Sequence, residues 1–310
     1  MPSPTAVVCG YSSVGTAALE GLLAAGVEVL ALYTYPQAPD ETWFTPPEAL
    51  AHARGIPVHM APAFNDNAVY EAIRALAPDF LFSFYFREMI QARFLEIPRQ
   101  GAFNLHGSLL PRYRGRAPLN WVLVKGETVT GVSLHAMTPR PDDGHLVGQT
   151  EIPIAWDETA LSLTAKAAAA GRDLVARLAR DLVDGTAPRI DQKTLGPSTY
   201  FGGRKPADSR LDPGMTVQEA FNQIRAVADP WPNAFLEAPQ GSVKVPWALP
   251  ADQACPPGCF QVTGGGVLVG FADGALRIHA LRHQGQRLER PTDQAAALRA
   301  IGFPEVPGLS

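Results

Sequence analysis

The chain has 310 residues, of which 46% are hydrophobic and 18% charged, as in an ordinary soluble globular protein of one large or two modest domains. No apolar run approaches the ~20 residues of a transmembrane helix, which excludes a membrane-spanning protein. The formal net charge of −4 argues against a dedicated nucleic-acid binder, which usually carries a basic face.

The N-terminus and the cysteines favour a cytoplasmic protein. The first residues, MPSPTAVVCG, have no basic region before the first apolar run, so they do not resemble a secretory signal. Three cysteines, an odd number in a chain of this length, do not make a disulfide framework. We therefore expect a reducing compartment and no membrane partner.

Short apolar runs alternate with helical periodicity through the first part of the chain. Strands are predicted at 5–9, 27–33, 56–59, 79–84 and 102–105, and helices at 13–25, 47–54 and 67–76. We expect Ser13 to cap the first helix. Several strands are apolar on both faces, which is typical of a parallel sheet with helices on both sides. Ligands of such sheets bind beyond the carboxyl ends of the strands.

The second part of the chain predicts two more strands and then a different unit. Strands at 130–137 and 146–153 flank a PDDG turn, and a long helix follows at 159–182. After a polar segment at 185–205, a helix at 216–227 precedes short β-like runs, as at 267–271 and 276–281. We therefore predict an α/β fold of three parts: a Rossmann-like domain (1–190), a linker (191–205) and a small OB-like β-barrel (206–310).

Three motifs favour structural interpretations. Gly10 to Gly15 resembles a dinucleotide fingerprint, but Ser12 stands at the close-approach glycine and no acidic residue ends the second strand, so we expect a tight turn and no NAD. Cys255 and Cys259 lack two further ligands at zinc spacing, and we expect no metal. His135 lies on a strand near Asp142, where it could support that carboxylate, but we favour a packed or exposed histidine.

The sequence FNLHGSLLPRYRGRAPLNW carries the strongest signal for chemistry. Side chains alternate faces along a strand, so Asn104 and His106 point the same way at a predicted strand end. Asp142 follows in the PDDG turn. An amide, an imidazole and a carboxylate in one cleft suit acyl transfer.

A small basic cluster follows His106 in the sequence. Arg112, Arg114 and Arg116 alternate with other residues in the loop after the strand. Their position beside a predicted cleft favours an anionic ligand, such as a folate glutamate or a nucleotide diphosphate.

The chain resembles the folate-dependent formyltransferases along nearly its whole length. The resemblance lies in FSFYFREMI (82–90), GAFNLHGSLLPRYRGRAPLNWVLVKGET (101–128) and RAVADPWPNAF (225–235). It is nearest to the domain that formylates UDP-4-amino-4-deoxy-L-arabinose for lipid A modification and polymyxin resistance. The resemblance implies 10-formyltetrahydrofolate as the formyl donor and no metal, in a monomer or small homo-oligomer.

The resemblance also implies the role of each site residue. Asn104 would stabilise the transition state, His106 would donate a proton, and Asp142 would raise the pKa of His106. The residues expected to line the folate pocket are Glu88, Met89, Ile90, Arg116, Thr138, Pro139, Arg140, Pro141 and Asp142.

The sequence departs from the family at three points. Asp143 replaces a small residue, so either Asp142 or Asp143 could be the functional carboxylate, and alignment to Gly144 favours Asp142. Glu88 stands where the nearest relatives have histidine. The chain ends at Ser310 without the dehydrogenase domain of the bifunctional relative, so we expect a separate chain to supply that activity.

Other functions remain as alternatives. A methionyl-tRNA formyltransferase is expected to have a basic loop between its first strands. Here residues 33–50 carry Asp40, Glu41 and Glu48 and no Lys or Arg, which argues against a tRNA substrate. Formylation of another nucleotide-linked amino sugar is a closer alternative. A binding module without catalysis would not need Asn104 and His106, and a nicotinamide oxidoreductase would need a complete fingerprint.

Overall fold

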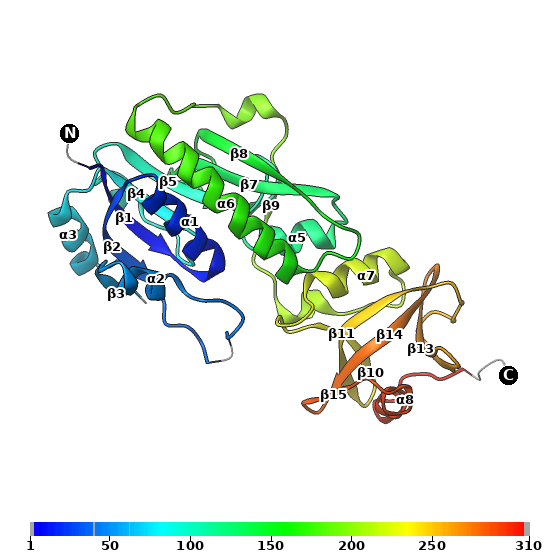
Figure 1. Ribbon diagram of the computed structural model, residues 1–310. Coiled ribbons are helices and arrows are strands. Elements are labelled where there is room, and N and C mark those ends of the chain that lie inside the picture. Colours follow the sequence, from blue (N-terminus) through cyan, green and yellow to red (C-terminus); the bar gives the residue numbers. More distant parts are fainter. Residues whose placement is uncertain (1–2, 40, 62, 307–310) are drawn as a thin grey trace. The chain divides into compact units, whose positions relative to one another are not determined.

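The structure is a computed structural model that describes residues 3–39, 41–61 and 63–306, so Asp40 of the predicted acidic loop lies outside the described residues (Figure 1). The chain divides into two compact units. The first comprises Met1–Pro118, Val129–Ile154 and Leu163–Gly202, and the second comprises Leu119–Thr128, Ala155–Ser162 and Gly203–Ser310. The predicted boundaries at 190 and 206 stay a prediction.

The first unit alternates strands and helices. Its elements are β1 (Thr5–Gly10), α1 (Ser12–Ala24), β2 (Glu28–Thr34), α2 (Pro47–Ala53), β3 (Val58–Met60), α3 (Asn67–Leu76), β4 (Phe80–Phe84), α4 (Ala92–Leu95), β5 (Gly101–His106), β6 (Arg114–Gly115), β7 (Val129–Ala136), β8 (Leu146–Pro153), most of α6 (Ala160–Val183), the 3-10 helix η1 (Gln192–Leu195) and β9 (Tyr200–Phe201).

Among the described residues, seven strands of this unit form one sheet in the order β3-β2-β1-β4-β5-β7-β8, and β6 and β9 form a separate two-stranded sheet. The pairs from β3 to β5 are parallel, whereas β7 pairs antiparallel with both β5 and β8. The prediction of a mostly parallel sheet is therefore confirmed. The carboxyl ends of β4 and β5 share one edge, and the loop after β7 returns to that edge.

Helices cover both faces of the sheet, as predicted. On one face, α6 lies against β5, because a Cβ added to Gly171 would meet Leu105 Cδ2 at 2.8 Å (Figure 1). On the opposite face, Ile73 of α3 and Phe94 of α4 pack in one core with Val7 and Leu81 of the sheet. Both faces are apolar because each is buried under helices.

The first helix begins one residue earlier than predicted. Tyr11 occupies the N-cap position and its side chain makes no capping hydrogen bond. Ser12 has a φ of 63°, which turns the chain sharply out of β1 into the helix. Ser13 therefore lies inside the first turn, and the prediction that it caps the helix was wrong.

The second unit is an antiparallel sheet with helices, which confirms the predicted C-terminal β unit. Its described elements are α5 (Pro118–Val124), η2 (Pro206–Ser209), α7 (Val217–Ala226), β10 (Ala234–Ala238), β11 (Gly241–Ala251), β12 (Phe260–Thr263), β13 (Gly266–Phe271), β14 (Gly274–His283), β15 (Gln286–Leu288) and α8 (Pro291–Ala300). Strand order is β10-β11-β14-β13-β12, and β15 pairs with β14.

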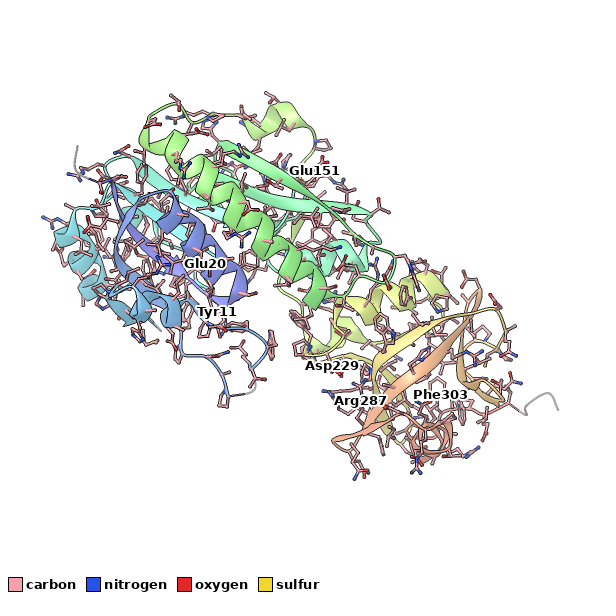
Figure 2. All side chains as sticks on the ribbon, viewed as in Figure 1. Tyr11, Glu20, Glu151, Asp229, Arg287 and Phe303 are labelled. Atoms are coloured by element: carbon pink, nitrogen blue, oxygen red, sulfur yellow. The ribbon has the colours of Figure 1, made fainter. Side chains whose placement is uncertain are left out.

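Local signals explain how the second unit is held. A capping box starts α7, in which Thr216 Oγ1 accepts from Glu219 N and the Glu219 carboxylate accepts from Thr216 N. Arg287 of β15 pairs with Asp229 at 2.6 Å (Figure 2). This pair is partly exposed, so it adds little to stability compared with the buried core around Phe221. Within the described parts of the chain, no helix has the length and apolar character needed to cross a membrane.

Candidate active site

A cavity of about 630 Å³ opens at the carboxyl ends of β4 and β5. Asn104 and His106 of β5 line it, and so does Asp142 of the loop between β7 and β8. The remaining residues predicted for the folate pocket also line it: Glu88, Met89, Ile90, Arg116, Thr138, Pro139, Arg140 and Pro141. The structure thus brings all the predicted site residues to one cavity, while their roles stay predictions.

Strand register places a second histidine in this site. β5 and β7 are antiparallel, and Asn104 lies directly opposite His135. Paired residues on adjacent strands share a face, so the two side chains meet: Asn104 Nδ2 is 3.0 Å from His135 Nε2. His135 is only 2% exposed. The favoured interpretation of His135 as a packed or exposed residue missed this contact, whereas the alternative, a histidine beside Asp142, agrees with the 3.5 Å between His135 Nε2 and Asp142 Oδ1.

The hydrogen bonds of His135 fix the orientation of the Asn104 amide. His135 Nδ1 is 2.8 Å from the carbonyl oxygen of Ala136, which can only accept, so Nδ1 carries a proton. With Nε2 unprotonated, it accepts from the Asn104 NH₂ at 3.0 Å, whereas a protonated Nε2 would face Asp142 Oδ1, 3.5 Å away. The second N–H of that NH₂ remains for a ligand in the cavity.

His106 is held from both sides by acceptors. Its Nε2 donates to the carbonyl oxygen of Tyr113 at 2.8 Å, and its Nδ1 lies 3.5 Å from Asp142 Oδ1. The longer distance leaves Nδ1 able to exchange a proton with a ligand. Because the ring is only 6% exposed, its protonation depends on these neighbours and on burial.

Burial lowers the pKa of His106 below its ordinary value of 6.5. The negative charge of Asp142 acts in the opposite direction, as the sequence predicted, but it does not outweigh the loss of solvation. Asp142 therefore raises the pKa of His106 as expected, but burial, which the expectation left out, makes the net shift downward. His106 is mainly neutral at pH 7 and can accept a proton.

Asp142 is the carboxylate that faces the histidines. Burial opposes its ionised form, but His106, His135 and the Gly115 N–H outweigh that and lower its pKa from 3.8 to about 2. The Gly115 N–H donates to Asp142 Oδ2 at 2.8 Å. Asp142 has a φ of 53°, a left-handed conformation that is rare for most residues but that aspartate, like glycine and asparagine, adopts more readily.

Asp143 points to a different partner, which separates the two adjacent carboxylates. Asp143 Oδ1 pairs with Arg114 Nη1 at 2.6 Å. The predicted basic cluster is therefore divided. Arg112 lies over the Tyr113 ring at 5.6 Å and Arg114 is held by Asp143, so Arg116 is the member that lines the cavity.

Glu88 is part of a polar wall of the cavity. Its carboxylate lies 3.5 Å from Tyr35 Oη and 3.4 Å from Asn65 Nδ2, and its backbone N–H donates to Tyr35 Oη at 3.2 Å. Tyr35 also stacks on Phe86 with ring centroids 4.7 Å apart. These contacts hold the loop after β4 in place, with Glu88 instead of the expected histidine.

We expect the stability of the protein to fall as the pH is lowered through 6.5, in part because of His106. The His106 ring binds a proton at its ordinary pKa of 6.5 in the unfolded chain, whereas burial resists protonation in the folded protein. The contribution of His106 to the free energy of unfolding is therefore present above pH 6.5, and it is lost as the pH falls from 6.5 to the lowered pKa of the folded ring. One proton changes the slope by at most about 1.4 kcal/mol per pH unit. Urea unfolding of the wild type and His106→Asn between pH 7.5 and 5 measures this. Equal slopes for the two proteins would contradict the expectation.

We expect Gly144→Ala to destabilise the loop after Asp142. A Cβ at Gly144 would lie 1.9 Å from the carbonyl oxygen of Ala136, so the backbone must move. Such overpacking costs about 1–3 kcal/mol of unfolding free energy. Gly202→Ala is the matched control, because no atom lies within 4 Å of its added Cβ. Chemical unfolding of both variants checks the difference, and equal losses would contradict it.

Two family models match the chain. The model of the formyl transferase family matches residues 10–178, more than half of the chain. The model of the C-terminal domain of formyl transferases matches residues 204–298. Across the residues described here, no group of histidine, cysteine and acidic side chains has the arrangement of a metal site.

Solved structures share the fold. HypX from Aquifex aeolicus, in complex with tetrahydrofolic acid, is 15% identical with a TM-score of 0.64, and the match covers 98% of this chain but 48% of HypX, about half its length. The N-formyltransferase from Helicobacter canadensis, in complex with folinic acid and dTDP-3-aminofucose, is 18% identical with a TM-score of 0.66 and coverages of 88% and 97%. Methionyl-tRNA formyltransferase from Clostridium thermocellum is 14% identical, with a TM-score of 0.56 and coverages of 80% and 93%.

Proposed function

The chain belongs to the formyl transferase family, and on that premise we propose that it transfers a formyl group from 10-formyltetrahydrofolate to the amine of a nucleotide-linked amino sugar. One observation carries the proposal. Asn104, His106 and Asp142 line the same cavity; Asp142 contacts His106 directly, and His135 contacts both Asn104 and Asp142. This set combines a hydrogen-bond donor, a proton carrier and a fixed negative charge.

The cavity suits a folate as the formyl donor. Its volume of about 630 Å³ falls in the usual range for small-molecule sites. Met89, Ile90 and Met137 supply apolar walls for a ring system, and Arg116 and Arg140 supply positive charge for the glutamate of a folate. The donor would bring an activated formyl group on N10, and the protein residues would orient it and move the protons.

The amide of Asn104 would stabilise the charge that develops during attack. As the sugar amine adds to the formyl carbon, negative charge grows on the formyl oxygen. The free N–H of Asn104 is a donor whose direction His135 already fixes, so it needs no reorganisation.

His106 would carry the proton from the amine to the leaving nitrogen. Its lowered pKa leaves it neutral at pH 7, so Nδ1 can take a proton from the attacking amine. Asp142 then stabilises the imidazolium. When the bond between the formyl carbon and N10 breaks, the imidazolium returns that proton to N10. The products are the N-formyl sugar and tetrahydrofolate, and His106 is neutral again.

We propose UDP-4-amino-4-deoxy-L-arabinose as the acceptor, on the strength of the sequence resemblance, with a role in lipid A modification. The structure of the Helicobacter canadensis enzyme with dTDP-3-aminofucose supports the broader class of nucleotide-linked amino sugars. A tRNA acceptor is disfavoured by the loop after β2, where Glu41 pairs with Arg87 at 2.7 Å. That pair neutralises a cation that would otherwise be available to a phosphate backbone.

A panel of acceptors tests the proposal. Purified protein is incubated with 10-formyltetrahydrofolate and, separately, UDP-4-amino-4-deoxy-L-arabinose, dTDP-linked 3- and 4-amino sugars, and methionyl-tRNA. Mass spectrometry reads the gain of one formyl group. We expect the UDP sugar to turn over fastest. Faster formylation of a dTDP sugar would change the acceptor, and faster formylation of methionyl-tRNA would overturn the proposed sugar class.

A further inference from the structure

The segment after α6 is bonded to the loops that form the active site. Leu146 and Ile190 exchange backbone hydrogen bonds of 2.9 and 3.0 Å. Farther along, β9 pairs in parallel with β6, so that Arg114 faces Tyr200 and Gly115 faces Phe201. Between these two anchors lies Gln192, which is 2% exposed.

The amide of Gln192 is fully used. Its Nε2 donates to the carbonyl oxygens of Asp142 at 2.9 Å and Gly144 at 2.7 Å. Its Oε1 accepts from Arg114 Nε at 3.2 Å and Nη2 at 2.7 Å. Because an arginine can only donate and a carbonyl can only accept, this amide has one possible orientation. A buried polar network that is satisfied in this way specifies one local structure.

The same arginine closes the network on the other side of the loop. Arg114 Nη1 pairs with Asp143 at 2.6 Å, so the backbone of the loop and the side chain of Asp143 are held together through Gln192 and Arg114. Asp142 is the first of the three residues attached in this way, and its φ is 53°. Left-handed φ values are uncommon outside glycine, although aspartate adopts them more readily than most residues, and the hydrogen bonds from Gln192 and the ion pair with Arg114 hold the loop in this conformation.

We infer that Gln192 is a positioning residue for formyl transfer, an inference that rests on the proposed function. Its hydrogen bonds to the carbonyl oxygens of Asp142 and Gly144 hold the left-handed turn that directs the Asp142 carboxylate toward His106 and His135. Arg114 and Asp143 are the outer part of the same device. Gln192 is not among the residues that line the cavity, so it acts through Asp142.

Substitution of Gln192 by methionine tests this role. Gln192→Met keeps the length of the side chain but removes all four hydrogen bonds. We expect kcat to fall about 100-fold, the effect of a misplacement of about 1 Å in a catalytic group, while the KM for the formyl donor changes less than about threefold. Lys193→Met, on the exposed side of η1, is the matched control and is expected to keep wild-type kinetics.

A second variant guards against a loss of folding. Asp143→Asn removes the charge at the half-buried end of the network without opening the core. We expect its kcat to fall about tenfold, with an unfolding midpoint close to that of the wild type. Circular dichroism of each variant reports the fold. Wild-type kcat in both Gln192→Met and Asp143→Asn would overturn the inference, as would a rise in KM alone.

A titration of His106 separates this inference from the proposed function. The charged or titratable groups near His106 are Asp142, His135 and Arg114. NMR of ¹⁵N-histidine-labelled protein follows the ring without substrates. If Asp142 turns away in Gln192→Met, the His106 titration moves to lower pH, as it also should in Asp142→Asn. An unchanged titration overturns the inference even in an active enzyme. A shifted titration in a protein that formylates no acceptor supports it and refutes the proposed function alone.

Discussion

Replacing Asn104 with alanine is expected to lower kcat for formyl transfer by about 10²–10³-fold, the usual cost of removing one donor from an oxyanion site. The next residue, Leu105, cannot replace this donor, because its side chain packs on the other face of the sheet against Gly171. The KM for either substrate should change little, since the interaction strengthens only in the transition state. Steady-state kinetics with both substrates varied measure the two constants.

Two further variants sharpen the result for Asn104. Asn104→Asp keeps the shape but replaces the donor by an acceptor that faces His135 Nε2, so it should be at least as impaired as Asn104→Ala. Asn67→Ala, on the exposed start of α3, is the control and should be unaffected. An Asn104→Asp enzyme with near wild-type kcat would contradict the donor role.

Substitution of His106 by asparagine is expected to lower kcat by about 10²–10⁴-fold, the range for loss of a general acid–base group. Asparagine can still donate to the Tyr113 carbonyl, but it cannot carry the proton between the amine and the leaving nitrogen. The loss should therefore be in kcat, and the pH dependence assigned to His106 should disappear. A pH–rate profile of wild type and variant measures both effects.

His145→Asn is the matched control for His106. His145 is exposed and follows Gly144 on the same loop, but it does not line the cavity of the proposed site. Adding Asp142→Asn to His106→Asn should cost little more than the single change, because the carboxylate acts through the histidine. Independent, additive losses would mean that Asp142 has a separate role.

The sequence predicted the helices and strands best where periodicity and flanking residues agree. The bounds of α3 (Asn67–Leu76) and β8 (Leu146–Pro153) coincide with the predicted ones. The Ser13 cap failed because the turn at Ser12 depends on a left-handed residue that is neither glycine nor asparagine. Periodicity and capping preferences do not reveal a left-handed conformation at a serine.

The sequence predicted some residues of the site and not others, because some of their contacts depend on local pattern and others on how distant segments pack. Alternation along one strand was enough to place Asn104 and His106 on a common face. The contact with His135 depends on antiparallel register between two strands, and the contact with Gln192 joins loops 50 residues apart in the sequence. The direction of the His106 pKa depends on how much water burial removes, which composition cannot give.

Because β5 pairs with β7, the buried residues on the face of the sheet opposite the cavity help to set the positions of the cavity residues. Leu105 and Leu134 are opposite each other one step along from Asn104 and His135, and both are fully covered. A shift of one residue in the pairing of these strands would turn the side chains of Asn104 and His135 into the apolar core and bring leucines to the cavity. A change of side-chain size at Leu105, or at Gly171 that packs against it, is therefore expected to lower activity while secondary structure and solubility remain intact.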